Sequence, residues 1–256
     1  MRENALHFEL QSRRDAPVWI ELEAASLENL SANPPLPWTF RLESGETRAA
    51  GTLVLQDPAL PYAQRLRWIV LSGDPDARPD DRARYCMPFG GAKPVRISQG
   101  YEGEATHQGL GAYALDFPMP IGTPVLAARG GRIVASPDDG AEGETNAEGD
   151  AREIDQHVVI EHDDGTFAMY AHLRRGDAAR PGQRVACGER IGYSGDTGRA
   201  TGPHLHFDVY RIRRDGQRQT IPVRFWDGTA EGFEPRVDRT YAPGCSPPRP
   251  SACDGR

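Results

Sequence analysis

The chain has 256 residues, of which 30 are basic and 37 acidic, and its formal net charge is -7. A net acidic chain lacks the clustered cations that nucleic acids require, so we expect no nucleic-acid partner. The sequence contains no apolar run of about 18 or more residues, and therefore no transmembrane segment is predicted. Its first residues contain no apolar signal segment. We therefore expect either that the protein stays inside the cell or that a leader has been removed.

The chain is rich in turn-forming residues, with 28 glycines and 22 prolines spread between short runs typical of strands. Long stretches rich in Ala, Glu and Leu, which would indicate helices, are absent from the sequence. This pattern favours strands joined by turns over helices. The predicted fold class is therefore mainly β.

Residues 1–72 are predicted to form a small N-terminal antiparallel β-sandwich. Five segments alternate apolar and polar residues with period two, as half-buried strands do; they are HFELQ, PVWIELEA, WTFRLES, GTLVLQ and RLRWIVLSG. Turns containing Pro or Gly separate them. We find no cluster of catalytic residue types in this part and interpret it as a packing or positioning domain.

A polar, proline-bearing segment at 73–85 is predicted to be a linker, followed by a second domain at 86–230 and a loosely ordered tail at 231–256. In the second domain, TPVLAA and RIVAS are predicted to form one hairpin, and HVVIEH and FAMYAHL another around DDGT. The acidic stretch at 138–153 is nearly devoid of apolar residues. We expect a solvated surface loop there, with a flap beside a cleft as the alternative.

Four cysteines allow three pairings. Cys245 and Cys253 are close in a proline-rich segment. Two interpretations are left there: a local disulfide between them, or two separate thiols. Cys86 and Cys187 lie in apolar surroundings and are expected to be small buried residues. No CxxC pair occurs, so we do not expect a thiolate zinc site.

Six of the seven histidines lie between residues 107 and 206. In TGPHLHFDVY, His204 and His206 are two residues apart, so a strand would project both imidazoles from one face and bury Leu205 and Phe207 on the other. In FAMYAHL, Tyr170 and His172 have the same spacing. Each pair by itself is also compatible with a purely structural role.

His107 and Asp116 lie in THQGLGAYALDFPMP, where the prolines disfavour a helix after the Asp. We expect Asp116 at a strand edge facing outward; the alternative is a turn residue that caps local N–H groups. Together these segments supply the His and Asp ligands that a catalytic zinc site needs. The Asp196-Thr197-Gly198 triplet matches aspartic proteases, but these need two such carboxylates and the sequence has one copy.

These segments, in the order His107…Asp116, GTPVLAA, MYAHL and IGYSGDTGRATGPHLHFDV, resemble the lysostaphin-type (LytM-like) zinc metallopeptidases. The resemblance covers about residues 86–212, roughly half of the chain. It implies an antiparallel β peptidase domain with a narrow groove, one zinc ion per chain and peptidoglycan peptides as substrate. It also implies a periplasmic or extracellular location. The N-terminal unit followed by YCMPFGG and ISQGY resembles a secreted subgroup.

By position, the resemblance implies zinc ligands and catalytic residues at five positions, with His107, Asp116 and His206 as ligands and His172 and His204 as catalytic groups. Many family members place the first His closer to the Asp, whereas nine positions separate the two here. Gly109 and Gly111 make the longer loop feasible. The substitutes would be His157 or His162, both expected at the surface, although His162 also matches a common structural His of the family.

Three functions remain in competition. The first is a zinc endopeptidase that hydrolyses peptidoglycan by a zinc-activated water, acting as a monomer. The second is a non-catalytic LytM-like regulator that activates cell-wall amidases, although all five site positions are present. The third is a phosphotransferase-type domain with two facing histidines, in which Asp116 would have no role as a metal ligand.

Overall fold

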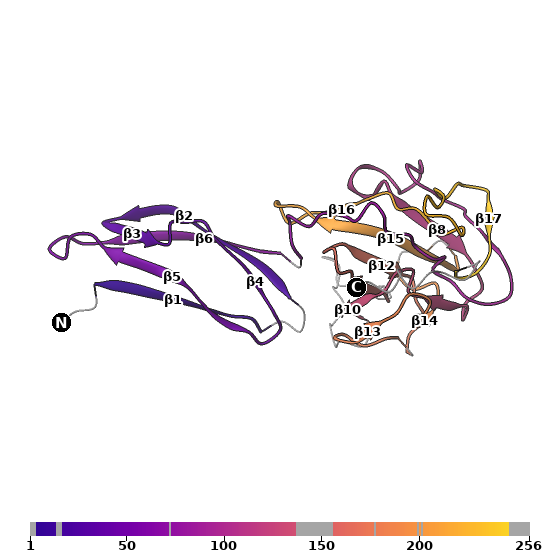
Figure 1. Ribbon diagram of the computed structural model, residues 1–256, viewed down its shortest axis with the longest axis horizontal. Coiled ribbons are helices and arrows are strands. Elements are labelled where there is room, and N and C mark those ends of the chain that lie inside the picture. Colours follow the sequence, from indigo (N-terminus) through magenta and orange to yellow (C-terminus); the bar gives the residue numbers. More distant parts are fainter. Residues whose placement is uncertain are drawn as a thin grey trace. The chain divides into compact units, whose positions relative to one another are not determined.

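The computed structural model describes residues 4–13, 17–71, 73–136, 156–176, 178–198, 200 and 202–245. These form two compact units (Figure 1), one made of Met1–Asp76 with Ile212–Gln217, the other of Ala77–Arg211 with Arg218–Arg256. The chain passes from the first unit to the second at residue 76, inside the segment predicted to be a linker. Among the described residues, no helix has the length and apolar character needed to cross a bilayer.

The first unit contains six strands, namely β1 (Ala5–Gln11), β2 (Val18–Glu28), β3 (Leu30–Asn33), β4 (Trp38–Leu42), β5 (Thr47–Leu55) and β6 (Ala63–Leu71). They form two three-stranded antiparallel sheets, in the orders β1-β5-β3 and β4-β2-β6. Both sheets contribute to one core, including Leu22, Leu42 and Leu53, none of which is exposed. This is the predicted sandwich.

The five segments predicted as strands in this unit are all strands. The sequence analysis missed β3, because LSAN is short and has only two apolar positions, too few for period two to show. Its strand conformation comes from pairing with β5, where Leu30 lies opposite Leu55.

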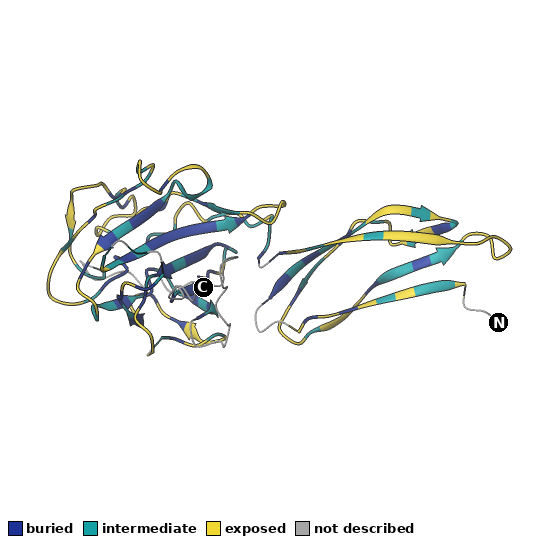
Figure 2. Ribbon diagram, turned by 180° about the vertical axis from the view of Figure 1, so that it is seen from behind, coloured by how far each residue is buried: buried dark blue, intermediate teal, exposed yellow. Residues whose placement is uncertain are grey.

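The second unit contains eleven strands and one short 3₁₀ helix, which confirms the mainly β prediction for the described residues. They are β7 (Val95–Arg96), η1 (Gly109–Gly111), β8 (Ala114–Pro118), β9 (Pro124–Leu126), β10 (Gly131–Ala135), β11 (Val158–Glu161), β12 (Phe167–Ala171), β13 (Arg184–Val185), β14 (Arg190–Tyr193), β15 (His204–Ile212), β16 (Arg218–Thr220) and β17 (Thr240–Tyr241). Seven of them form one sheet in the order β13-β10-β11-β12-β15-β16, with β8 also paired to β15. Figure 2 shows the central strands β12 and β15 mostly in dark blue, the colour of buried residues.

One predicted hairpin is confirmed and the other is wrong. Strands β11 and β12 pair around the DDGT turn, but β9 pairs with β14, while β10 pairs with β11 and β13. Gly131 gives the physical reason: a Cβ there would lie 2.3 Å from the carbonyl oxygen of Glu161. The missing side chain lets β10 approach β11 closely, which favours its pairing with β11 over β9.

Residues 231–245 are packed rather than loosely ordered, in contrast to the prediction. Strand β17 pairs with β7, and the rings of Phe233 and Tyr241 stack with centroids 5.2 Å apart. Phe233 and Tyr241 also pack on the main core of this unit. The segment is proline-rich, which suggested a tail, but two of its aromatic side chains hold it on the core. Residues 246–256 and the acidic stretch at 138–153 lie outside the described residues, so those predictions stay untested.

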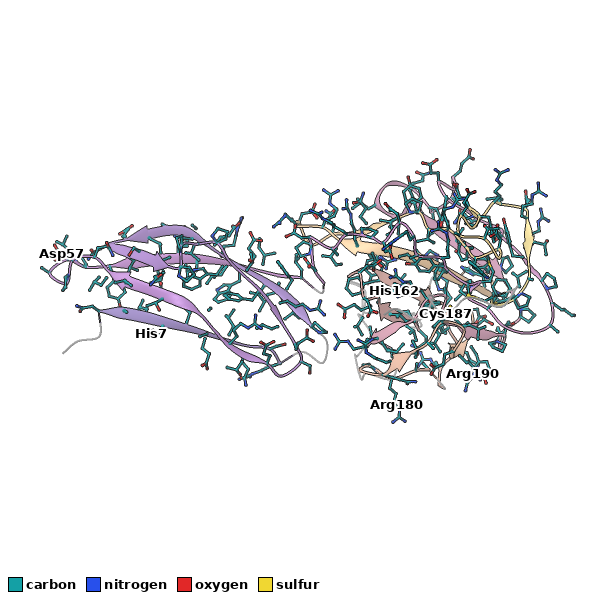
Figure 3. The ribbon with its side chains drawn as sticks, viewed as in Figure 1. His7, Asp57, His162, Arg180, Cys187 and Arg190 are labelled. Carbon is teal, nitrogen blue, oxygen red and sulfur yellow. A yellow bond between two sulfur atoms is a disulfide. The ribbon has the colours of Figure 1, made fainter. Side chains whose placement is uncertain are left out.

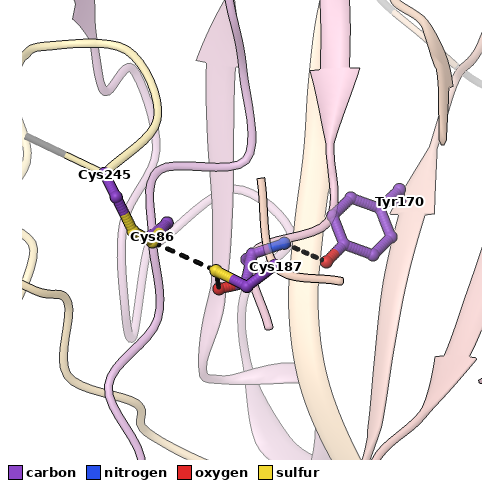
Figure 4. The surroundings of a disulfide bond; sticks show 5 residues. Cys86, Tyr170, Cys187 and Cys245 are labelled. Atoms are coloured by element: carbon purple, nitrogen blue, oxygen red, sulfur yellow. Dashed lines mark hydrogen bonds between the residues drawn. A yellow bond between two sulfur atoms is a disulfide. The ribbon is translucent and has the colours of Figure 1, made fainter. Parts of the chain in front are cut away.

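The cysteines are arranged differently from the local pairing considered for the C-terminal segment. Cys245 forms a disulfide with Cys86, 159 residues away in sequence (Figure 4), and Cys253 lies outside the described residues. Both Cys86 and Cys187 are 1% exposed, which confirms their expected burial, and their sulfur atoms lie 3.1 Å apart. The packing of residues 231–245 brings Cys245 to this buried pair, a contact that sequence proximity could not reveal.

This disulfide gives a first testable expectation. A cross-link that closes so long a loop stabilises a fold by about 2–4 kcal/mol, chiefly by restricting the unfolded chain. We expect Cys245→Ser to lower the free energy of unfolding by that amount in chemical denaturation. Peptide mapping without reduction should join the Cys86 and Cys245 peptides; a Cys245–Cys253 linkage would contradict the structure.

Candidate metal centre

The site is built on strand β15, whose two faces differ in polarity. Leu205 and Phe207 are fully buried in the core, whereas the side chains of His204 and His206 are 15% and 20% exposed on the opposite face. The alternation predicted from the sequence is therefore present. It holds both imidazoles on a strand whose apolar face is fixed by packing.

Strand β8 brings a carboxylate to the same place. It pairs antiparallel with β15, and Asp116 lies directly opposite His206 in the register. The Oδ1 atom of Asp116 is 2.9 Å from Nδ1 of His206. Asp116 is thus inside a paired strand rather than at an outward-facing edge, because β8 joins the sheet through β15.

His107 reaches the same carboxylate from the loop before β8. Its Nε2 atom lies 3.4 Å from Oδ2 of Asp116, and its ring is 2% exposed. The helix η1, in which Gly109 has a φ of 60°, takes up part of the eight-residue segment between His107 and Asp116. The long spacing therefore does not keep His107 away from Asp116.

The geometry of these three residues fits a bound cation. One ligand atom from each of His107, Asp116 and His206 lies within 4.8 Å of the others. In the described part of the chain, Nε2 of His107 is buried and has no hydrogen-bond partner. A buried nitrogen without a partner is costly, and a metal ion beside it would satisfy it. Two imidazoles and a carboxylate are also a donor set that zinc accepts.

The charges at the site lead to the same conclusion. Burial raises the pKa of the Asp116 carboxyl, but its contacts with the rings of His107 and His206 outweigh this and hold the pKa well below its ordinary value. For His206, burial lowers the pKa, while Asp116 and Asp208 raise it, with a net value of about 9. Asp116 and His206 therefore stabilise each other's charged forms, and a metal cation would compete with the proton for the same groups.

The structure brings two further histidines beside this cluster. The ring of His172 lies 4.6 Å from that of His204 and 6.0 Å from that of His206, measured between centroids. Because a carbonyl only accepts, Nδ1–H of His172 donates to Thr197 O, and Nδ1–H of His204 donates to Gly202 O. In both neutral rings Nε2 is then the nitrogen that can accept a proton.

The predicted alternation along FAMYAHL fails at His172. Strand β12 ends at Ala171, and His172 has a φ of 62°, a left-handed conformation that is rare for a residue other than glycine. Tyr170 is instead fully buried, and its hydroxyl accepts from the N–H of Ala128. His172 thus leaves the strand geometry to reach the site, a local strain typical of functional positions.

The two substitute ligands do not join the cluster. His162 is 2% exposed, so its expected surface position is wrong. Its Nδ1–H donates to Gly130 O, and its ring contacts that of Tyr85. Figure 3 shows His162 among the strands of the second unit. His157 is only partly exposed and is likewise absent from the group of metal-ligating atoms found among the described residues.

Sequence analysis missed several residues that hold the site in place. Gln99 donates from Nε2 to Oδ2 of Asp116 at 3.0 Å, and Gly100 O accepts from Nδ1–H of His107 at 2.9 Å. Thr197, part of the triplet that resembled an aspartic protease, supplies the carbonyl for His172, while Asp196 is exposed. A backbone carbonyl is present at every residue, so the sequence does not show which one accepts a hydrogen bond. The one usable signal was the HxHxD spacing, which places Asp208 two residues after His206.

Comparison with known proteins agrees with this picture for part of the chain. Residues 111–221 match the family model described as Peptidase family M23. Peptidoglycan DD-endopeptidase ShyA from Vibrio cholerae is 39% identical over 94 residues, which cover 37% of this chain and 19% of the relative. Glycyl-glycine endopeptidase ALE-1 from Staphylococcus capitis is 41% identical over 95 residues, covering 37% and 23%.

Among solved structures, the catalytic domain of lysostaphin from Staphylococcus simulans matches with a TM-score of 0.35 and 28% identity, over 50% of this chain and 88% of that domain. The two curated relatives are matched over about a fifth of their own length. The family match confirms the resemblance drawn from the motifs. His107 lies outside residues 111–221, so its inclusion in the site rests on the geometry.

The burial of His162 predicts a pH-dependent stability. Its pKa is lowered to about 4, first because burial disfavours the charged ring and then because Arg129 is near. As the pH falls below the ordinary value of 6.5, the unfolded chain binds a proton before the folded one does. The stabilisation present above that value should therefore be lost toward pH 4, by about 3 kcal/mol.

We expect His162→Gln to remove this component, so that its unfolding free energy falls less steeply between pH 7 and pH 4 than that of the wild type. Urea denaturation at several pH values measures it. His7→Gln, at an exposed position in the first unit, is the control. Identical slopes for wild type and His162→Gln would show that His162 is not buried in its neutral form.

Proposed function

We propose that this chain, which carries a domain of peptidase family M23, is a zinc metalloendopeptidase that hydrolyses peptide bonds in bacterial cell-wall peptidoglycan. The main support is the convergence of ligand atoms from His107, Asp116 and His206 within 4.8 Å. A second support is the similarity to ShyA, which is named a peptidoglycan DD-endopeptidase and is 39% identical to this chain over 94 residues. Such a substrate implies a periplasmic or extracellular location, which we include in the proposal.

In this proposal His107, Asp116 and His206 hold one zinc ion. A catalytic zinc with three protein ligands keeps one position for water, lowers the pKa of that water toward about 7 and polarises the scissile carbonyl. Nε2 of His107 and Nδ1 of His206 are the ligand nitrogens, because Nδ1 of His107 donates to Gly100 O and Nε2 of His206 contacts Asp208. Gln99 orients the carboxylate of Asp116.

His172 and His204 perform the proton transfers in this scheme. Their Nδ1–H groups are anchored on backbone carbonyls, so each ring presents Nε2 as the acceptor. Such a nitrogen takes a proton from the attacking water and, once protonated, donates to the amine leaving group or stabilises the oxyanion. The carbonyl anchors fix ring orientation without adding charge. All five side chains come from one chain, and we propose that the protein acts as a monomer.

Two substitutions separate metal binding from proton transfer. We expect His206→Ala to lose bound zinc, because it removes one ligand of three. His172→Ala should retain about one zinc per chain and lose turnover by about 100-fold or more, the usual contribution of general acid–base catalysis. Metal analysis of the purified proteins and digestion of purified sacculi, followed by mass spectrometry of the products, measure both effects.

His7→Ala is the matched control, since His7 is exposed on the sandwich unit, and it should retain both zinc and turnover. New free amines in the product peptides would identify the bond that is cleaved. Wild-type protein that binds zinc but releases no products would contradict the enzyme and favour the non-catalytic regulator of amidases. Wild-type digestion by both site variants would disprove the assigned roles.

A further inference from the structure

Asp208 is a buried carboxylate next to the candidate site. In the proposed reaction it neither binds the metal nor transfers a proton. It lies two residues after His206 on β15, so both side chains project from the same face of the strand. Its side chain is 1% exposed. Across the sheet it faces Met169 on β12 and Ala114 on β8, neither of which can compensate a charge. Burying a carboxylate here costs several kcal/mol unless it is paired.

Among the described residues, only one oxygen of this carboxylate has hydrogen-bond partners. Oδ2 lies 3.2 Å from Nε2 of His206 and also accepts a hydrogen bond from the guanidinium of Arg218. Oδ1 is buried and has no partner in the part of the chain that the structure describes. A core built for stability would satisfy both oxygens or use an apolar residue instead. The arrangement therefore indicates a role for Asp208 in orienting His206.

Arg218 holds the carboxylate from the neighbouring strand. It begins β16, which lies beside β15 in the sheet. Its guanidinium stacks over the ring of Tyr210, 4.2 Å from the centroid, and its Nη1 contacts the sulfur of Met169 at 2.9 Å. The planar group is thus fixed on two sides, so its hydrogen bond to Asp208 has a defined direction.

These contacts determine which nitrogen of His206 carries a proton. An arginine only donates, so Oδ2 of Asp208 must be an acceptor, and Nε2 of His206 must be the donor to it. In the neutral ring Nδ1 then has a lone pair, and it faces Oδ1 of Asp116 at 2.9 Å. A proton on Nδ1 makes this contact an ordinary hydrogen bond, and a bound metal ion takes the place of that proton. Nδ1 is thereby selected as the ligand atom.

We propose that Asp208, clamped by Arg218, is a positioning residue that fixes the tautomer and orientation of His206 for metal binding. The proposal rests on the proposed function insofar as the metal is zinc. The proposal has a specific consequence. The affinity for zinc should depend on the ion pair between Asp208 on β15 and Arg218 on β16, although this ion pair does not contact the metal. Carboxylates that orient ligand histidines generally contribute about 10–100-fold to metal affinity.

The test compares zinc affinity in three proteins, using zinc alone in competition with a chromophoric chelator. We expect Asp208→Asn to weaken zinc binding about 10–100-fold, because the amide can donate to Nε2 and so place the proton of His206 on Nδ1. Asp164→Asn is the matched control, since Asp164 forms the comparably buried ion pair with Arg129 in the same unit. It should leave zinc affinity unchanged.

A second readout follows the tautomer directly. In ¹⁵N spectra of the zinc-free protein, recorded at a pH at which the ring of His206 is neutral, the proton should lie on Nε2 in the wild type and on Nδ1 in Asp208→Asn. Wild-type affinity in Asp208→Asn, or an equal loss in Asp164→Asn, would overturn the positioning role. Sacculus digestion separates this result from the proposed function: a wild type that binds zinc but is inactive disproves the enzyme, while the affinity comparison still decides the role of Asp208.

Discussion

The site depends on the antiparallel pairing of β15 with β8 on one side and β12 on the other. In that register His206 lies opposite both Asp116 and Ala171. A slip by one residue would turn His206 into the core and Leu205 onto the site, because side chains alternate along a strand. Leu205 and Phe207 are fully buried, and burying each contributes roughly 1.5–3 kcal/mol. The hydrophobic core therefore fixes the register, and the register brings the ligands together.

Hydrogen bonds to the far nitrogen of each ring decide how the four imidazoles are used. His107, His172 and His204 each donate Nδ1–H to a backbone carbonyl, so each presents Nε2. His206 differs, because its Nε2 contacts the carboxylate of Asp208. Backbone carbonyls are rigid and uncharged, whereas a carboxylate also makes the ring a stronger base. The one ring oriented by a side-chain charge is the one placed closest to Asp116.

Departures from ordinary packing rules gather at this site. Among the described residues, His107 Nε2 and Asp208 Oδ1 are buried without a hydrogen-bond partner, and His172 has a left-handed backbone. Each lowers stability by about 1–3 kcal/mol. The surrounding unit offsets these costs through its continuous core and through the Cys86–Cys245 cross-link. Such local violations are expected where a fold keeps groups ready for a ligand.

The sequence by itself determined the mainly β fold, the N-terminal sandwich and the polar face shared by His204 and His206, because period-two alternation is a local property. Motif order also predicted the family. Only the tertiary structure decided that β9 pairs with β14, that Cys245 bonds to Cys86, and that His172 leaves its strand. It alone placed Asp116 opposite His206 and revealed Asp208 and Arg218 behind that ring. Strand pairings, carbonyl contacts and the disulfide join residues up to 159 positions apart, and no local pattern encodes which distant partner a strand or a sulfur will meet.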